Sequence, residues 1–276
     1  MIITDKFVYI HMPKTGGTFV ETVLHKIHEA RGDVFERRRA DQAPRRRPLR
    51  EWFQKRRPVF LELYNQAGEN DWNQHGHVSQ IPPEHAHKPI LTTLRNPYDR
   101  YVSQYEFEWW KQNPGSFFRH FETLKERYPN YPELTFEEFV TLSNAYSADE
   151  INLRFEPDDQ LGRHTVQFIK YFYRNPALLT EIDAAYLAEK RYEADLAQNL
   201  HYTFTHDLNQ QLYDFLRTMD YAHEEIAFVL QHKKVLPNGK GRNEDQKWEK
   251  YYTPALKAYV RHHERLLYTK FPVFDC

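Results

Sequence analysis

Short apolar runs, each followed by a turn and then by an apolar stripe of helical period, recur along the chain. The first run, Phe7 to Met12, is rich in β-branched and aromatic residues, as is typical of a buried strand. Pro13 cannot continue a strand ladder, and from Thr18 onward apolar residues return at three- and four-residue spacings. These residues are Phe19, Val20, Val23, Leu24 and Ile27. The pattern therefore predicts a strand, a tight loop and a helix within residues 1–30.

The same pattern returns at Lys88 to Arg95, an apolar run that stops at the turn signal Asn96-Pro97. Asp99 occupies a position suited to a helix N-cap or first turn, and a helical pattern follows. Its apolar members are Tyr101, Val102, Tyr105, Phe107 and Trp109. In open α/β sheets, ligands bind at the carboxyl ends of the strands. We therefore expect the loop after the first strand and Arg95 to meet on one rim of a sheet.

Weaker patterns fill the rest of the chain. They predict a strand at 59–64, short helices and loops over 111–176 with a capped helix start at 135–140, helix over 177–200, a strand at 202–205, a helix at 207–219, a basic loop over 233–247 and a last helix opening at 253–255. No internal repeat or linker stands out. We predict an α/β fold, with a central, mainly parallel sheet flanked by helices in three layers as in P-loop proteins, and a single domain over residues 1–276.

Residues 31–58 differ in kind from their surroundings because arginine and lysine far outnumber acidic residues there. The basic residues are Arg31, Arg37, Arg38, Arg39, Arg45, Arg46, Arg47, Arg50, Lys55, Arg56 and Arg57. One interpretation is a solvated insertion. The other is a basic lip that collects an anionic substrate. Residues 111–176 are a second insertion, where we expect acceptor specificity to lie.

Composition limits the function classes. The chain has 276 residues and a formal net charge of −1, so no global field draws it to nucleic acid. Its one cysteine, Cys276, excludes an internal disulfide framework and favours a reducing compartment. No apolar run approaches the ~20 residues of a membrane span, and no signal-peptide pattern is present. We expect a soluble, cytoplasmic protein of bacterial type, with unknown oligomeric state.

The loop between the first strand and its helix has the chemistry of an anion site. Glycines that open a helix present backbone N–H groups and the positive end of the helix dipole, and Lys14 adds a full charge. The order Gly-x-x-x-x-Gly-Lys-[Ser/Thr] is absent, because Lys14 precedes Gly16 and Gly17. Arg95 and Ser103 suit a second phosphate. Two phosphate sites indicate a nucleotide with phosphates at both ends of its ribose, although a plain turn with a surface lysine stays open.

Two segments carry a family resemblance. Residues 13–18, Pro-Lys-Thr-Gly-Gly-Thr, resemble the 5′-phosphosulfate loop of sulfotransferases that use 3′-phosphoadenosine 5′-phosphosulfate (PAPS), and residues 94–103 resemble their 3′-phosphate segment. The similarity is greatest to the carbohydrate branch, the heparan sulfate 2-O- and 6-O-sulfotransferases, and covers residues 7–28 and 75–105. The resemblance implies PAPS as cofactor, with adenosine 3′,5′-bisphosphate (PAP) as product. The cofactor-binding residues it implies are Pro13, Lys14, Thr15, Gly16, Gly17, Thr18, Arg95 and Ser103.

The segment His75-Gly76-His77-Val78-Ser79 resembles the 2-O enzymes in particular. The resemblance implies that His77 is the catalytic base and that His75 assists it. Lys14 is expected to balance charge on the leaving phosphate. A sulfuryl group carries less charge than a phosphoryl group, so we expect no metal. The expected partner is a hydroxyl-bearing acceptor, a saccharide in this branch, and neither a nucleic acid nor a membrane.

Other functions stay open on the sequence alone. Sulfation of a small molecule or a phenol would use the same cofactor motifs. His75 and His77, with His85 and His87, could hold zinc. A nucleotide kinase would require Mg²⁺ and a lysine followed by Ser or Thr after the glycines. A non-enzymatic module that binds polyanions through its arginines would show salt-sensitive binding that survives loss of Lys14.

Overall fold

A computed structural model describes most of the chain and separates it into two compact units. The first unit comprises Met1–Arg95 and Ala197–Lys240, and the second comprises Asn96–Leu196 and Gly241–Cys276. The described residues are 1–39, 59–66, 72–113, 124–126, 128–145, 147, 160–233 and 244–275.

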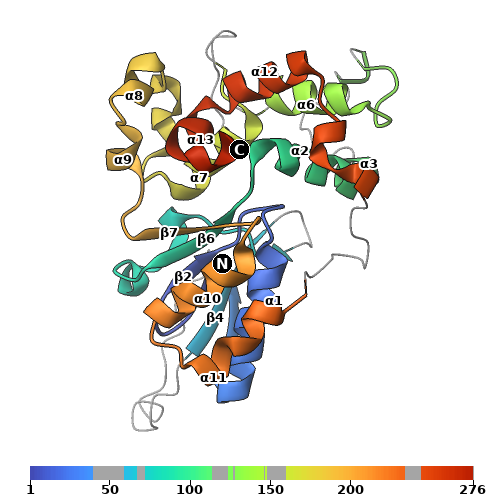
Figure 1. The fold of residues 1–276 in the computed structure, drawn as a ribbon. Coiled ribbons are helices and arrows are strands. Elements are labelled where there is room, and N and C mark those ends of the chain that lie inside the picture. The colour runs from blue at the N-terminus through green and yellow to red at the C-terminus, as the bar shows by residue number, and fades with distance from the viewer. Residues whose placement is uncertain are drawn as a thin grey trace. The chain divides into compact units, whose positions relative to one another are not determined.

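The first unit is built on a mixed sheet (Figure 1). Its strands are β1 (Ile2–Ile3), β2 (Val8–Ile10), β3 (Val34–Arg39), β4 (Val59–Gln66), β5 (Trp72–Asn73), β6 (Ile90–Leu94) and β7 (Leu200–Phe204). The order is β3-β4-β1-β2-β6-β7, and β5 pairs with β4. β1 runs antiparallel to both of its neighbours, while β2, β6 and β7 are mutually parallel and β3 is parallel to β4. The predicted α/β class with a mainly parallel sheet flanked by helices is confirmed.

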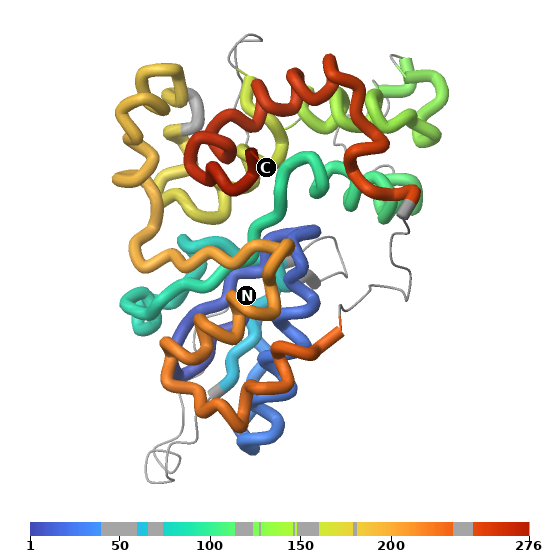
Figure 2. The backbone as a smooth tube through the Cα atoms, viewed as in Figure 1, coloured from blue at the N-terminus to red at the C-terminus, as the bar shows by residue number. Residues whose placement is uncertain are grey.

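The core of this unit lies between one face of the sheet and the helices α1 (Gly17–Arg31), α10 (Leu208–Thr218) and α11 (His223–Ile226). Phe7 and Tyr9, two residues apart on the strand segment, both point into this core. The apolar stripe of α1 meets the stripe of α10 there, although the two helices are far apart in the sequence (Figure 2). Short 3-10 turns at η2 (Val78–Gln80), η3 (Pro83–His85) and η7 (Ala227–Gln231) complete the unit.

The basic region 31–58 is only in part the insertion that the sequence suggested. Val34–Arg39 form β3, the strand at one end of the sheet order, in register with β4 from Val34↔Val59 to Arg39↔Tyr64. The sequence predicted no strand in this region, yet these six residues form one. Strand pairing with β4 fixes them because it satisfies their backbone groups. Residues 40–58 lie outside the described part of the chain.

The second unit is helical. Its helices are α2 (Pro97–Phe107), α3 (Trp109–Gln112), α6 (Phe136–Ala145), α7 (Arg163–Phe172), α8 (Ala184–Ala188), α9 (Tyr192–Asp195), α12 (Pro254–His263) and α13 (Arg265–Lys270), with 3-10 turns η6 (Pro176–Glu181), η9 (Glu244–Gln246), η10 (Trp248–Lys250) and η11 (Pro272–Asp275). The predicted capping box at α6 is confirmed, since Thr135 N–H donates to Glu138 Oε2 at 2.8 Å and Glu138 N–H to Thr135 Oγ1 at 3.3 Å.

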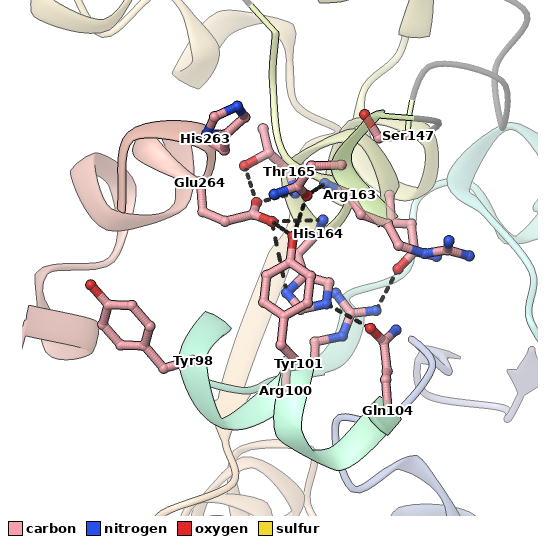
Figure 3. Close-up of polar contacts among 12 residues, drawn as sticks. Tyr98, Arg100, Tyr101, Gln104, Ser147, Arg163, His164, Thr165, His263 and Glu264 are labelled. Carbon is pink, nitrogen blue, oxygen red and sulfur yellow. Dashed lines mark hydrogen bonds and ion pairs between the residues drawn. The ribbon is translucent and has the colours of Figure 1, made fainter. Parts of the chain in front are cut away.

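A buried carboxylate ties the helices of this unit together (Figure 3). Glu264, fully buried between α12 and α13, accepts hydrogen bonds from Thr165 N–H at 2.7 Å, Thr165 Oγ1 at 2.7 Å and His164 N–H at 3.0 Å. These N–H groups open α7, so Glu264 caps that helix from a distant part of the chain. Tyr101 of α2 also donates to Glu264, at 2.5 Å. No local sequence signal indicates this network, because its members lie up to 163 residues apart.

Two predicted helices are broken. Residues 177–200 form η6, α8 and α9 rather than one helix, and Lys190 between α8 and α9 has φ +54°. The helix that begins at Pro97 stops at Phe107 because Glu108 has φ +52°, and α3 follows. In both places a left-handed residue interrupts the helical hydrogen bonding.

Candidate functional site

The loop between β2 and α1 adopts the sharp conformation that its glycines predict. Lys14 has φ +61° and Gly16 has φ +89°, both in the left-handed region. Residues other than glycine rarely adopt this region, so the surrounding loop holds Lys14 in a conformation that it would not favour by itself. Gly16 precedes α1 with no side-chain cap, and the first turn contains no acidic residue. The first N–H groups of a helix have no partner within it, so this end of α1 suits an anion.

Thr15 has a structural contact in this loop. Its hydroxyl is fully buried and donates to the carbonyl of Met12 at 2.8 Å, which closes the turn. The proton of that hydroxyl is therefore already used in a hydrogen bond to the backbone. Any contact of Thr15 with a phosphate would be made by its backbone and not by its hydroxyl. Thr18 is half-buried on the first turn of α1, and Pro13 stands at the start of the turn.

Arg95 lies beside this loop, as the rim argument predicts. β2 and β6 are adjacent and parallel, with Val8↔Ile90 and Ile10↔Thr92 in register. The residues that follow both strands therefore emerge at the same edge of the sheet. Nη1 of Arg95 lies 3.5 Å from the carbonyl oxygen of Lys14. Two cationic residues from separate segments thus meet at one edge.

His11 packs against the start of α1. A Cβ at Gly17 would lie 1.9 to 2.6 Å from atoms of the His11 ring, so only glycine fits there. Nδ1 of His11 lies 2.9 Å from Oε1 of Glu21, one turn further along α1. His11 is 4% exposed, so it is packed next to the loop.

His75 is connected to this packing and His77 is held by its own turn. Nδ1 of His75 donates to the carbonyl of His11 at 3.0 Å, and the two rings meet edge-on with centroids 4.7 Å apart. Nδ1 of His77 lies 2.8 Å from Oγ of Ser79. The backbone N–H of His77 donates to Oε1 of Gln80 at 3.1 Å. The structure thus brings His75 to the loop region through His11, and His77 contacts Ser79 and Gln80 of its own turn.

Comparison with known proteins now gives the family. A family model described as the sulfotransferase family matches residues 1–231, most of the chain. The chain belongs to the sulfotransferase family. Among curated proteins no match is found. The match covers the loop, Arg95 and both histidines, and it extends over most of the first unit and over the Asn96–Leu196 part of the second.

Ser103 and Trp248 of this sulfotransferase belong to the second unit. Ser103 is half-buried on α2, and its role beside a 3′-phosphate stays a prediction. Trp248 stacks on Tyr98 with ring centroids 5.2 Å apart and an interplanar angle of 14°, and Lys257 Nζ lies 5.0 Å from its ring centre. Its ring is thus engaged within its own unit.

The zinc alternative found no support in the described residues, where no group of three or more His, Cys, Asp or Glu side chains is arranged to hold a metal ion. Nor does any described helix have the length and apolar character needed to cross a membrane.

Sequence reasoning missed Glu21 of this sulfotransferase. A carboxylate ten residues after His11 has no periodic relation to it, because a tight turn lies between them. Sequence reasoning also missed Glu62 on β4, which is 4% exposed and surrounded by polar partners. A charged residue within an apolar strand was the one available signal.

Proposed function

We propose that this sulfotransferase transfers a sulfuryl group from PAPS to a carbohydrate hydroxyl and releases PAP. The contact between Arg95 and the carbonyl of Lys14 at 3.5 Å is the observation that carries this proposal. It supports one nucleotide site built from two strand ends, as a cofactor with phosphates on both sides of its ribose requires. The family match supports sulfuryl transfer in general.

Lys14 and the loop would stabilise charge on the leaving group. PAPS supplies the sulfuryl group when it is bound. Lys14 would then balance the negative charge that grows on the 5′-phosphate, and the N–H groups at the start of α1 would donate to it. Arg95 would hold the 3′-phosphate. The cationic lysine, the uncapped helix start and the acid-free first turn all fit an anionic cofactor.

His77 would act as the base that takes the proton from the acceptor hydroxyl. Histidine suits this role because its ordinary pKa lies near neutrality. His75 would assist by orienting the base or the acceptor. Its Nδ1–H is already directed to the His11 carbonyl, so a neutral ring has its lone pair on Nε2.

The proposal is tested by transfer itself. Purified protein is incubated with sulfur-labelled PAPS and a panel of saccharides and phenols, and labelled product is separated and located by mass spectrometry. We expect label on a saccharide hydroxyl, with EDTA present throughout. Transfer to phenols alone would replace the saccharide with a small-molecule acceptor. Transfer to no hydroxyl, from protein that binds PAP, would contradict the proposal.

A further inference from the structure

A polar groove of about 580 Å³ opens beside α1 in the first unit. This volume falls within the usual range for ligand pockets, roughly 300–1,000 Å³. The groove is lined by Thr18, Glu21, Thr22, His25, Lys26, Glu29, Arg37, Glu62, Tyr64 and Gln74. It begins at Thr18, in the proposed 5′-phosphate loop, and includes Gln74, the neighbour of His75. Its position next to the loop and to the histidine segment suits the molecule that receives the sulfuryl group.

A buried carboxylate organises one side of the groove. The side chain of Glu62 is 6% exposed, and Oε2 accepts from Arg37 Nε at 2.7 Å and from the Tyr64 hydroxyl at 2.9 Å. Oε1 contacts Nε2 of His25. Burial and the hydrogen bond to Glu62 raise the pKa of Tyr64 to about 12, so Tyr64 stays a neutral hydroxyl. The tyrosine oxygen keeps acceptor capacity toward the groove.

The cations of the groove have contacts that reduce their pull on a negative ligand. The guanidinium of Arg37 is paired with Glu62, and Nζ of Lys26 lies 4.3 Å from the ring centre of Phe228. Three carboxylates, Glu21, Glu29 and Glu62, line the groove against the two permanent cations Arg37 and Lys26. Glu29 is exposed on α1. Because Arg37 and Glu62 pair with each other, an anionic ligand would meet Glu21 and Glu29 against Lys26 among the described residues of the groove.

We infer that this groove binds the acceptor and selects a hydroxyl-bearing molecule without negative charge. The inference rests on the proposed function and deepens it by naming the acceptor class. Hydroxyl and amide groups at Thr22, Tyr64 and Gln74 can pair with acceptor hydroxyls, whereas carboxylate or sulfate groups would face Glu21 and Glu29. A neutral saccharide fits this groove. The resemblance to heparan sulfate enzymes would instead suggest an acidic polysaccharide, which does not fit it.

The test compares acceptors that differ only in charge. One pair is a glucan tetrasaccharide and the glucuronan tetrasaccharide that has carboxylates in place of its primary alcohols. A second pair is 4-hydroxyphenylacetamide and 4-hydroxyphenylacetate. For any pair in which sulfuryl transfer is observed, we expect kcat/KM for the neutral member to exceed kcat/KM for the anionic member by about tenfold or more. Equal values, or a preference for the anion, would overturn the inference, as would failure of both neutral members to bind the PAP-loaded protein in calorimetry.

A charge reversal locates the effect in the groove. In Glu29→Lys we expect the ratio of kcat/KM for anionic over neutral acceptor to rise about tenfold. Glu224→Lys, on α11 outside the groove, is the matched control and should leave the ratio unchanged. An unchanged ratio in Glu29→Lys would contradict the inference. PAP binding is titrated in parallel. Its absence would contradict the proposed function itself, whereas intact PAP binding with anion preference would overturn the acceptor class alone.

Discussion

Lys14, Gly16 and Gly17 show how single residues shape the loop. Two of them adopt left-handed backbone angles, and the third leaves room for the ring of His11. The sequence order of lysine before glycine already argued against an ATP loop. The structure adds that the lysine residue itself takes part in the turn, so its backbone as well as its charge belongs to the site.

Gly17→Ala tests the packing of His11 on the loop. The new methyl group would lie 1.9 to 2.6 Å from ring atoms of His11, so the ring or the helix start has to move. We expect PAP affinity to fall at least tenfold and the free energy of unfolding to fall by about 1–3 kcal/mol. The control is Gly32→Ala at the other end of α1, where φ is +69° and a Cβ meets open space, so the substitution strains the backbone without touching His11. Affinity for PAP, measured by calorimetry, should be unchanged in the control.

His77→Ala tests the proposed base. We expect turnover to fall by ~10²-fold or more with PAP affinity retained, because the base acts on the acceptor proton and not on the nucleotide. His87→Ala, at an exposed position in the turn before β6, serves as the control. The measurement is steady-state transfer over a range of pH. Turnover near that of the wild type in His77→Ala would remove the assignment.

Helices and strands reflect long-range partners more than local propensity. The sequence predicted β2, β4, β6, α1 and α10, whose apolar residues contribute to a common core, and it predicted the short strand β7 as well. It missed β3, where arginines mask a strand that β4 stabilises by pairing. It also joined α8 and α9, because a left-handed turn at Lys190 leaves no trace in hydrophobic period. Glu264, which caps α7, is about a hundred residues away from that helix in the sequence. The sequence around α7 therefore could not predict this cap.

Glu264→Gln tests that cap. The amide replaces one acceptor oxygen with a donor that faces the N–H and hydroxyl groups of Thr165. We expect the free energy of unfolding to fall by about 2–3 kcal/mol, since hydrogen bonds to a charged group are lost at a buried helix start. Glu181→Gln, at an exposed position in η6, is the control. Urea unfolding followed by circular dichroism provides the measurement, and a change below about 0.5 kcal/mol would contradict the role.

At the scale of the molecule, buried histidines make both units sensitive to acid. Burial lowers the pKa of His28 in the first unit, and burial together with the nearby Arg100 and Arg163 lowers the pKa of His164 well below its ordinary value in the second. His164 contacts Gln104 Oε1 at 3.0 Å, and its Nδ1 is 3.9 Å from Glu264, too far for a hydrogen bond. A neutral imidazole fits these contacts.

The free energy of unfolding should therefore fall as pH falls below about 6.5. The unfolded chain binds protons at its ordinary histidine pKa, whereas the folded chain does so only at lower pH. Each such histidine contributes a slope of up to about 1.4 kcal/mol per pH unit. Urea midpoints between pH 7.5 and 5.5 give the slope. Burial raises the pKa of Glu264, which acts in the opposite sense, so His164→Gln is needed to isolate the histidine. An equally steep slope in that variant would contradict the account.

The central claim is that the loop at Pro13–Thr18 and Arg95 form one site for a nucleotide with both 3′ and 5′ phosphates. Thermal unfolding with adenosine 3′,5′-bisphosphate plus EDTA, against ATP plus Mg²⁺, tests it most directly. We predict that the bisphosphate raises Tm without metal, that ATP with Mg²⁺ does not, and that Lys14→Ala and Arg95→Ala each reduce the shift. Stabilisation by ATP with Mg²⁺ alone, or a bisphosphate shift that survives both substitutions, would contradict the claim.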